Sequence, residues 1–247
     1  MSSAGLIYKY YGKEVLLNVI KSLNLSFDES NIGGLYDRIY EDFIKMIDAR
    51  DNGINQYENL DELVPRFHDN TSFNNQIGRL NPMWNSEIND PSGQFKLGLG
   101  VAEHEFTSQV KFLVEGFFPA YSIVKEAMIE REKFHSSGEV IYLKKSCPWK
   151  EHLFNLEEEM KLAGKIKFVL FGDQDQGYRV QTVGVKLGSF SFRLGIKKEW
   201  RGLKVDDLKK ISNIDDIVFV HNNGFIGGAK SLESAIKMVN ESLKDNN

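Results

Sequence analysis

Hydrophobic residues recur at helical spacing through the first half of the chain. The clearest stripe joins Leu35, Ile39, Phe43, Met46 and Ile47, and charged residues occupy most positions between them. Apolar residues at every third or fourth position share one face of a helix. Similar stripes run over residues 15–23, 106–117 and 119–128. We therefore expect a mainly helical first half whose apolar stripes pack in a core.

A polar stretch interrupts these helices from about residue 52 to residue 98. It contains the strings PRF, RLNPMWN and NDPSG. Proline, glycine and asparagine in such strings are typical of turns and loops.

The pattern changes near residue 134. Short β-branched and aromatic runs predict strands over residues 139–143, 166–171, 178–185, 189–194 and 217–220. Helical patterns lie between or after them, over residues 148–162, 205–212 and 231–243. We therefore expect two domains, residues 1–134 and 135–247, the second of which is α+β.

Composition excludes several classes of protein. Hydrophobic residues make up 41% and charged residues 27% of the chain, as in ordinary globular proteins. No run approaches the roughly 20 apolar residues of a membrane span, so we expect no membrane partner. A single cysteine, Cys147, excludes an internal disulfide framework and indicates a reducing compartment.

Charge is divided unevenly along the chain, although the net charge is only −4. Residues 28–69 contain eleven acids and four bases, whereas residues 144–210 contain fifteen bases and nine acids. An acidic region can hold a metal ion, and a basic region can hold phosphates. Two solvated surfaces of opposite sign are the alternative interpretation.

Asp48 and Asp51 are candidate metal ligands. They lie three residues apart at the end of the strongest helical stripe, in IDARDNG, which places them on neighbouring parts of one face. Carboxylate oxygens suit Mg²⁺ or Mn²⁺, but a metal site needs more ligands than two aspartates. A solvated helix end is the alternative.

A glycine-rich segment is a candidate phosphate-binding loop. In VFVHNNGFIGGAKS an apolar strand leads into Gly224, Gly227 and Gly228, and Lys230 precedes a predicted helix. Glycines at a helix start let backbone N–H groups approach an anion. A plain glycine-rich connection is the alternative.

Aromatic and basic residues interleave in SFSFRLGIKKEWRGL. Such a mixture can stack bases and neutralise the phosphates of a single strand. Phe190 and Phe192 also share one face of the predicted strand, where core packing is the alternative. The segment contains Phe190, Phe192 and Trp200 together with Arg193, Lys197, Lys198 and Arg201.

Six strings resemble one known family in the same order. They are SSAGLIY, DNGINQY, RLNPMWN, CPWKEHL, EWRGL and VFVHNNGFIGG, and the likeness runs from Ser2 to about Leu243. They are similar to segments of the melanocyte-proliferating-gene family, the eukaryotic branch of the DHH phosphoesterases. Its members are described as 3′–5′ RNA exonucleases of the nucleus and mitochondrion.

The resemblance implies an α/β fold, with the remainder of a DHH catalytic domain before a smaller α+β substrate-binding domain. It implies a Mn²⁺- or Mg²⁺-dependent phosphodiesterase that acts on single-stranded RNA or short oligonucleotides, in the nucleus or mitochondrion. Asp51 would be the catalytic metal ligand, with Asp48 beside it. The residues expected around the substrate are His221, Gly227, Gly228, Lys230, Arg193 and Arg201.

The same resemblance identifies what the sequence lacks. The family's H-x-G-x-x-H-x-D-E motif, an aspartate at a strand end and the D-H-H triplet do not occur here. We therefore expect this chain by itself to be inactive, and to expose apolar surface that favours a homo-oligomer. The alternative is a non-catalytic module that binds nucleic acid or a partner.

Overall fold

The computed structural model describes the chain except for residues 60–61, 63, 65–66, 87–89, 174–176 and 245–247. The polar stretch predicted over residues 52–98 therefore lies partly outside the described residues. The chain forms two compact units, Met1–Glu115 and Gly116–Asn247, which are described separately below.

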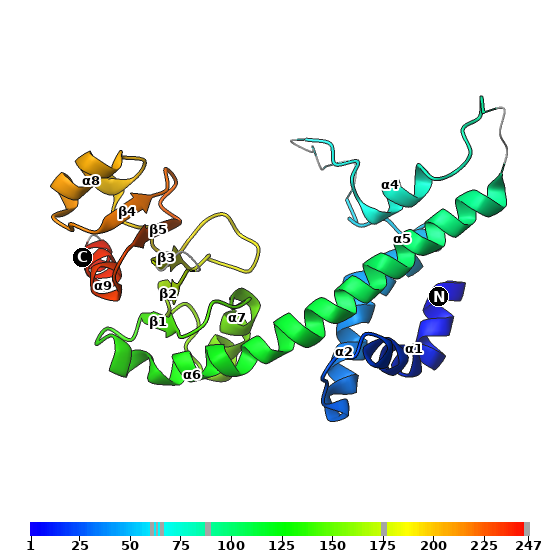
Figure 1. Ribbon diagram of the computed structural model, residues 1–247, viewed down its shortest axis with the longest axis horizontal. Helices are drawn as coiled ribbons and strands as arrows, with labels where there is room; N and C mark the ends of the chain where they lie inside the picture. Colours follow the sequence, from blue (N-terminus) through cyan, green and yellow to red (C-terminus); the bar gives the residue numbers. More distant parts are fainter. Residues whose placement is uncertain (60–61, 63, 65–66, 87–89, 174–176, 245–247) are drawn as a thin grey trace. The chain divides into compact units, whose positions relative to one another are not determined.

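The first unit is helical, as its apolar stripes predict (Figure 1). Ser2 caps the first helix, because its side chain accepts a hydrogen bond from the backbone N–H of Gly5. Asp90 caps the last α-helix of this unit in the same way, because its side chain accepts a hydrogen bond from the backbone N–H of Gly93. The helices are α1 (Ser3–Ser22), η1 (Glu29–Asn31), α2 (Ile32–Ile39), η2 (Tyr40–Ile44), α3 (Lys45–Asp51), α4 (Phe73–Gly78) and α5 (Pro91–Lys111).

The core of the first unit contains Leu35, Ile39 and Phe43 of the predicted stripe, whereas Met46 and Ile47 are half-buried. Leu35 and Ile39 of α2 are fully buried, as are Leu16 of α1 and Val110 of α5. Helix α5 begins at Pro91, because Asp90 and Pro91 together form a helix start inside the stretch predicted as loop.

The second unit is an α+β structure. A π-helical turn, η4 (Phe112–Phe117), leads to its first helix, α6. The helices are α6 (Phe118–Phe134), α7 (Lys150–Glu159), η5 (Lys198–Trp200), α8 (Val205–Ser212) and α9 (Leu232–Lys244). The strands are β1 (Val140–Leu143), β2 (Phe168–Gly172), β3 (Tyr178–Thr182), β4 (Ile217–Val220) and β5 (Ile226–Ala229).

The described strands form one mixed sheet in the order β1-β2-β3-β5-β4. Strands β1 and β2 are parallel, and the other pairs are antiparallel. In the register, Val180 of β3 lies opposite Gly227 of β5, which lies opposite Val220 of β4. Strand β5 therefore lies inside the sheet, between two strands that precede it in sequence.

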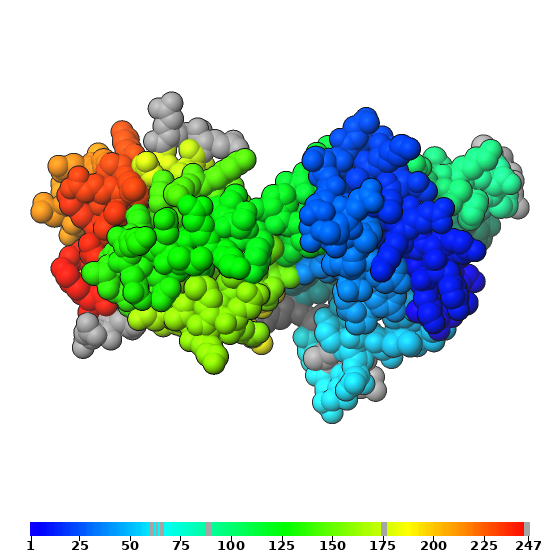
Figure 2. Space-filling model, turned by 90° about the horizontal axis from the view of Figure 1, so that it is seen from below, coloured from blue at the N-terminus to red at the C-terminus, as the bar shows by residue number. Residues whose placement is uncertain are grey.

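Alternate residues of the strands enter two hydrophobic cores, one on each face of the sheet. Val169 of β2 packs with Val124 and Met128 of α6 and Leu153 of α7. Phe168 and Leu170, its neighbours in β2, pack with residues of α8 and α9. In the space-filling view, α6 lies at the surface of the second unit, in green (Figure 2).

Four of the five predicted strands are confirmed, and one is wrong. Residues 189–194 form a loop with a single bridge, between Gly184 and Phe192. The structure confirms an α/β chain, whereas the relation of the first unit to a DHH domain stays a prediction. Contacts divide the chain after Glu115 rather than after residue 134, because α6 packs on the sheet of the second unit.

None of the helices in the described part of the chain has the length and apolar character needed to cross a bilayer.

Candidate functional site

A cavity of about 470 Å³ opens on the second unit, and we call it the aromatic pocket. Its volume falls within the range of small-molecule sites. Its aromatic residues are Trp149, Phe154, Phe190, Phe192 and Phe225. Its charged and polar side chains are Lys150, Gln181, Thr182, Lys186, Ser189 and Asn223.

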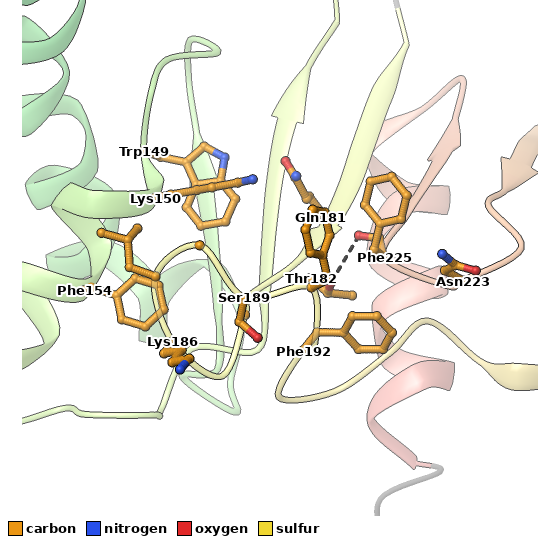
Figure 3. Close-up of a pocket in the computed structure, with 14 residues that line it drawn as sticks. Trp149, Lys150, Phe154, Gln181, Thr182, Lys186, Ser189, Phe192, Asn223 and Phe225 are labelled. Atoms are coloured by element: carbon orange, nitrogen blue, oxygen red, sulfur yellow. Dashed lines mark hydrogen bonds between the residues drawn. The ribbon is translucent and has the colours of Figure 1, made fainter. Parts of the chain in front are cut away.

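Four segments supply the walls of the aromatic pocket (Figure 3). The start of α7 provides Lys150 and Phe154, and β3 provides Gln181 and Thr182. The loop after β3 and the β4–β5 turn complete the walls. Thr182 ties two of these segments together, because its backbone N–H and its hydroxyl both donate to the carbonyl of Phe225, at 2.9 and 3.1 Å.

The loop after β3 is held by its own backbone. The N–H of Val185 donates to Ser191 at 2.9 Å, and that of Arg193 donates to Val183 at 2.9 Å. This loop projects from the sheet, in yellow in Figure 1. Phe190 is fully exposed on it, with a relative exposure of 101%. An ordered loop thus presents an aromatic ring to solvent at the edge of the pocket.

The aromatic pocket has the chemistry of a single-strand binding site. Aromatic faces stack on any base, and cations beside them attract the phosphates. Lys150 and Lys186 provide those cations. Of the interleaved residues in the sequence pattern, Phe190 and Phe192 line the pocket, whereas none of the pattern's bases is among the described lining residues. Trp200 is 2% exposed and belongs to the core.

The side chain of Arg193 is nearly buried and bonded to other groups of the protein. Its guanidinium makes a bidentate contact with Glu157, at 2.6 and 2.7 Å, and also donates to the carbonyl of Ile166. Both side chains are nearly buried, at 8% and 2% exposure. The ion pair anchors the end of the loop that carries Phe190. The contact of Arg193 with RNA stays a prediction.

Arg201 and His221 each lie beside the β4–β5 turn. The Nε of Arg201 donates to the carbonyl of Ile196 at 2.8 Å, and a Cβ on Gly224 would collide with this guanidinium. His221 is exposed, its Nδ1 accepts from the N–H of Asn223 at 3.2 Å, and its ring lies 4.6 Å from that of Phe225. The structure therefore places both predicted residues at a turn that also lines the aromatic pocket.

Gly227 and Gly228 belong to strand β5, not to a loop at a helix start, so the expected local structure was wrong. They pair with β3 on one side and β4 on the other. A Cβ on Gly228 would lie 2.8 Å from the guanidinium of Arg179, which also stacks over Phe219 at 5.4 Å. The two glycines thus make room for side chains packed across the sheet.

The N-terminus of α9 is already occupied by protein groups. The hydroxyl of Ser231 accepts from the N–H of Ser234 at 3.2 Å, which caps the helix. Burial raises the pKa of the Asp216 carboxyl, but hydrogen bonds from Ser231 and Ser234 outweigh it and lower the pKa. A carboxylate beside this helix end disfavours a phosphate there, although Lys230 is exposed nearby.

Asp48 and Asp51 differ in their surroundings. Asp48 is buried and accepts hydrogen bonds from the backbone N–H of Ser2 and, at 3.3 Å, from Asn52. The hydrogen bond from Ser2 lowers the pKa of Asp48. Asp48 therefore ties the start of α1 to α3, whereas Asp51 is exposed at the end of α3.

These two carboxylates do not make a complete metal site. Mg²⁺ requires six oxygen ligands in near-ideal geometry. Within the described residues, no group of three or more histidine, cysteine, aspartate or glutamate side chains could hold a metal ion.

Sequence reasoning missed most of the aromatic pocket. Trp149, Lys150 and Phe154 come from one helix start, while Gln181 and Asn223 come from distant segments. The adjacent Trp149 and Lys150 were a weak local signal of an aromatic and basic surface. Their meeting with β3 and the β4–β5 turn depends on the packing of α7 and could not be read from spacing.

The chain matches one family over almost its whole length. The family model MYG1_exonuc, described as an uncharacterised protein family (UPF0160), matches residues 1–243. The chain is 38% identical to the "MYG1 protein" of Dictyostelium discoideum over 98% of this chain and 72% of that protein. It is 40% identical to the "MYG1 exonuclease" of Bos taurus, covering 98% of this chain and 62% of that protein.

A human relative resembles the chain to about the same extent. The chain is 38% identical to the "MYG1 exonuclease" of Homo sapiens over 98% of this chain and 63% of that protein. The chain thus spans less than two thirds of the length of these two mammalian relatives. Among solved structures, none matches.

Proposed function

This chain belongs to the family that the MYG1_exonuc model describes, and we propose that it functions in a metal-dependent phosphodiesterase of the 3′–5′ exoribonuclease type. Its substrate would be single-stranded RNA or short oligonucleotides. The relatives of Bos taurus and Homo sapiens are among those named exonuclease, which supports the reaction class. The aromatic pocket is the observation that carries the proposal for the substrate.

The role proposed for the second unit is to hold a single strand. One or two bases would stack on Phe190, Phe192 or Phe225, and Lys150 and Lys186 would lie near the phosphates. Gln181 and Asn223 can donate to or accept from the edge of a stacked base. A stacking site of this kind favours unpaired strands, because the bases of a duplex are already stacked on one another.

The role proposed for the first unit rests on Asp51. Its exposed carboxylate can contribute one ligand to a Mn²⁺ or Mg²⁺ ion. Asp48 is a weaker candidate, because its oxygens already accept hydrogen bonds that hold α1 in place. Further ligands are needed for catalysis, because these two carboxylates cannot fill the coordination sphere.

A specific observation also favours a second function, that of a module that binds RNA without cutting it. The aromatic pocket is complete within this chain, whereas the described residues contain no group of three metal-binding side chains. Binding and cleavage must therefore be measured separately.

The first test measures binding of a labelled single-stranded oligoribonucleotide by fluorescence anisotropy. Phe190→Ala should weaken binding about tenfold, since base–aromatic stacking contributes about 1–3 kcal/mol. Phe190 is fully exposed, so its loss should leave the fold intact. Tyr10→Ala is the control, since Tyr10 is an exposed aromatic residue of α1. Equal affinities of the parent chain and Phe190→Ala would remove the aromatic pocket as the interface.

The second test follows cleavage of the same oligonucleotide with Mn²⁺. We expect this chain alone to bind without cleaving. If the parent chain cleaves the oligonucleotide and Asp51→Asn does not, the chain is a complete enzyme that uses Asp51. Cleavage that persists in Asp51→Asn would contradict the role of Asp51.

A further inference from the structure

The first unit contains two adjoining hollows that share part of their lining. One is an apolar cavity of about 670 Å³ among α3, α4 and α5. The other is a shallower hollow of about 440 Å³ on the adjacent surface. Arg50, Asn74 and Gly78 line both hollows, which therefore adjoin, and we call the two together the α4 site.

The larger hollow suits a flat, mostly apolar group. Its walls include Phe73, Ile77, Pro82, Phe95 and Leu99, and its volume falls within the range of small-molecule sites. Phe95 and Leu99 are 68% and 53% exposed, so they are accessible to a ligand. Asn81 and Gln94 also line it and provide amide groups at its walls.

The smaller hollow suits an anion. It is lined by Arg50 and Arg79 together with Asn70, Asn74 and Asn75. Arg79 is oriented by a hydrogen bond from its guanidinium to the carbonyl of Asn70, at 2.7 Å. No acidic side chain is among the described residues that line either hollow, although residues 28–69 are rich in acids. Two guanidinium groups in a lining whose described residues include no acid favour a phosphate, which they can bind through paired hydrogen bonds.

Together the two hollows match a ligand with a flat ring at one end and a phosphate at the other. We propose that the α4 site binds a nucleoside monophosphate, with the base in the apolar cavity and the phosphate on Arg50 and Arg79. Asn74 lines both hollows, and its Nδ2 contacts the sulfur of Met46 at 2.9 Å, which leaves its Oδ1 as an acceptor for the ligand.

The site deepens the function proposed above without depending on the aromatic pocket. A 3′–5′ exoribonuclease releases nucleoside monophosphates, and Arg50 directly precedes Asp51 in the chain. If the exonuclease proposal holds, the α4 site would retain a product of the reaction or sense its concentration. The binding itself can be measured without any cleavage.

The test is equilibrium binding of adenosine 5′-monophosphate to the whole chain by isothermal titration calorimetry, with a chelator present. We expect saturable binding, with adenosine and inorganic phosphate each binding at least about tenfold more weakly, because each occupies one hollow. The double variant Arg50→Met/Arg79→Met should bind the monophosphate about tenfold or more weakly, since charge-assisted hydrogen bonds are lost. Lys96→Met, at an exposed position of α5 outside both hollows, should bind as the parent chain does.

A matched pair of variants tests the cavity. Leu99→Trp should fill it and abolish binding of the monophosphate. Leu97→Trp should not, because Leu97 is 56% exposed on the same helix and does not line the cavity. Both variants should keep the parent chain's affinity for single-stranded RNA if the α4 site and the aromatic pocket are separate sites.

Three results would overturn the α4 site: no binding of the monophosphate, equal binding of adenosine and its monophosphate, or equal effects of Leu97→Trp and Leu99→Trp. None of these concerns Phe190. Failure of this inference is therefore distinguishable from failure of the proposed RNA interface.

Discussion

Arg193 and Glu157 show how an arginine of a basic and aromatic segment can be engaged by a buried carboxylate within the fold. The sequence places Arg193 in a basic and aromatic segment, which suggests contact with RNA. In the structure its charge is matched by a carboxylate that is 2% exposed. The guanidinium therefore anchors the end of the loop that carries Phe190.

This pair leads to a stability prediction. Arg193→Met should lower the free energy of unfolding by about 3–5 kcal/mol, because it leaves the carboxylate of Glu157 buried without its counterion. Urea denaturation followed by circular dichroism measures this loss. Adding Glu157→Gln should recover part of it, because the amide oxygen can still accept from the N–H of Ile166, which now donates to Glu157 at 3.0 Å.

An exposed ion pair provides the control for Arg193. Lys237 and Glu233 lie 2.9 Å apart on α9, with side chains 55% and 80% exposed. Lys237→Met should change stability by less than about 1 kcal/mol, because solvent screens such pairs. If Arg193→Met costs no more than Lys237→Met, the buried pair does not stabilise the loop.

At the scale of elements, β5 is the strand that the sequence pattern did not predict. Its residues, Ile226 to Ala229, include two adjacent glycines, which ordinarily indicate a turn. In the sheet those glycines are required by their neighbours: a Cβ on Gly227 would lie 2.8 Å from the Cε of Met238 and 3.0 Å from the carbonyl oxygen of Phe219. Close approach of other groups, rather than backbone freedom, explains glycine here.

Gly227→Ala should therefore destabilise the second unit by about 1–3 kcal/mol, the usual cost of overpacking a core. The matched control is Gly172→Ala at the end of β2, where an added Cβ meets nothing within 4 Å. That variant should change stability by no more than about 0.5 kcal/mol. Thermal unfolding of the two variants, compared in one buffer, checks the difference; similar melting temperatures would contradict the packing argument.

The predictable elements are those whose side chains repeat with a period. The stripe through Leu35 and Ile39 predicted buried helix, and the runs around Ile141 and Val169 predicted strands in the core, as found. The strand predicted around Phe190 is wrong because its alternating residues make a single bridge, between Gly184 and Phe192, within a loop closed by its own backbone. Phe190 faces solvent there. The aromatic pocket could not be predicted, since its walls come from segments separated by more than 70 residues, from Trp149 to Phe225.

At the scale of the whole molecule, the division of the chain follows packing rather than the change in sequence texture. Strands begin near residue 140, but α6 already belongs to the core beneath β1 and β2. Val124 and Met128 of α6 are fully buried in that core. A boundary drawn where strands begin would therefore remove one wall of the second unit.

Two fragments test this division. Residues 116–247 should fold by themselves and unfold cooperatively. Residues 135–247 should not, because each fully buried side chain of α6 contributes about 1.5–3 kcal/mol, against a typical domain stability of about 5–15 kcal/mol. The dispersion of backbone amide signals in NMR spectra distinguishes the two outcomes. Well-dispersed spectra from both fragments would show that α6 is dispensable.

The central position of β5 also determines when the sheet can form during synthesis. Strand β4 reaches the rest of the sheet through β5, so it has no partner until residues 226–229 have left the ribosome. The β4–β5 hairpin can then form quickly from local contacts and dock as a unit onto β3, whose backbone stays unpaired on that side until this moment. The growing chain thus exposes an open strand edge until β5 has been made, and it is at this stage that chaperones would protect it most.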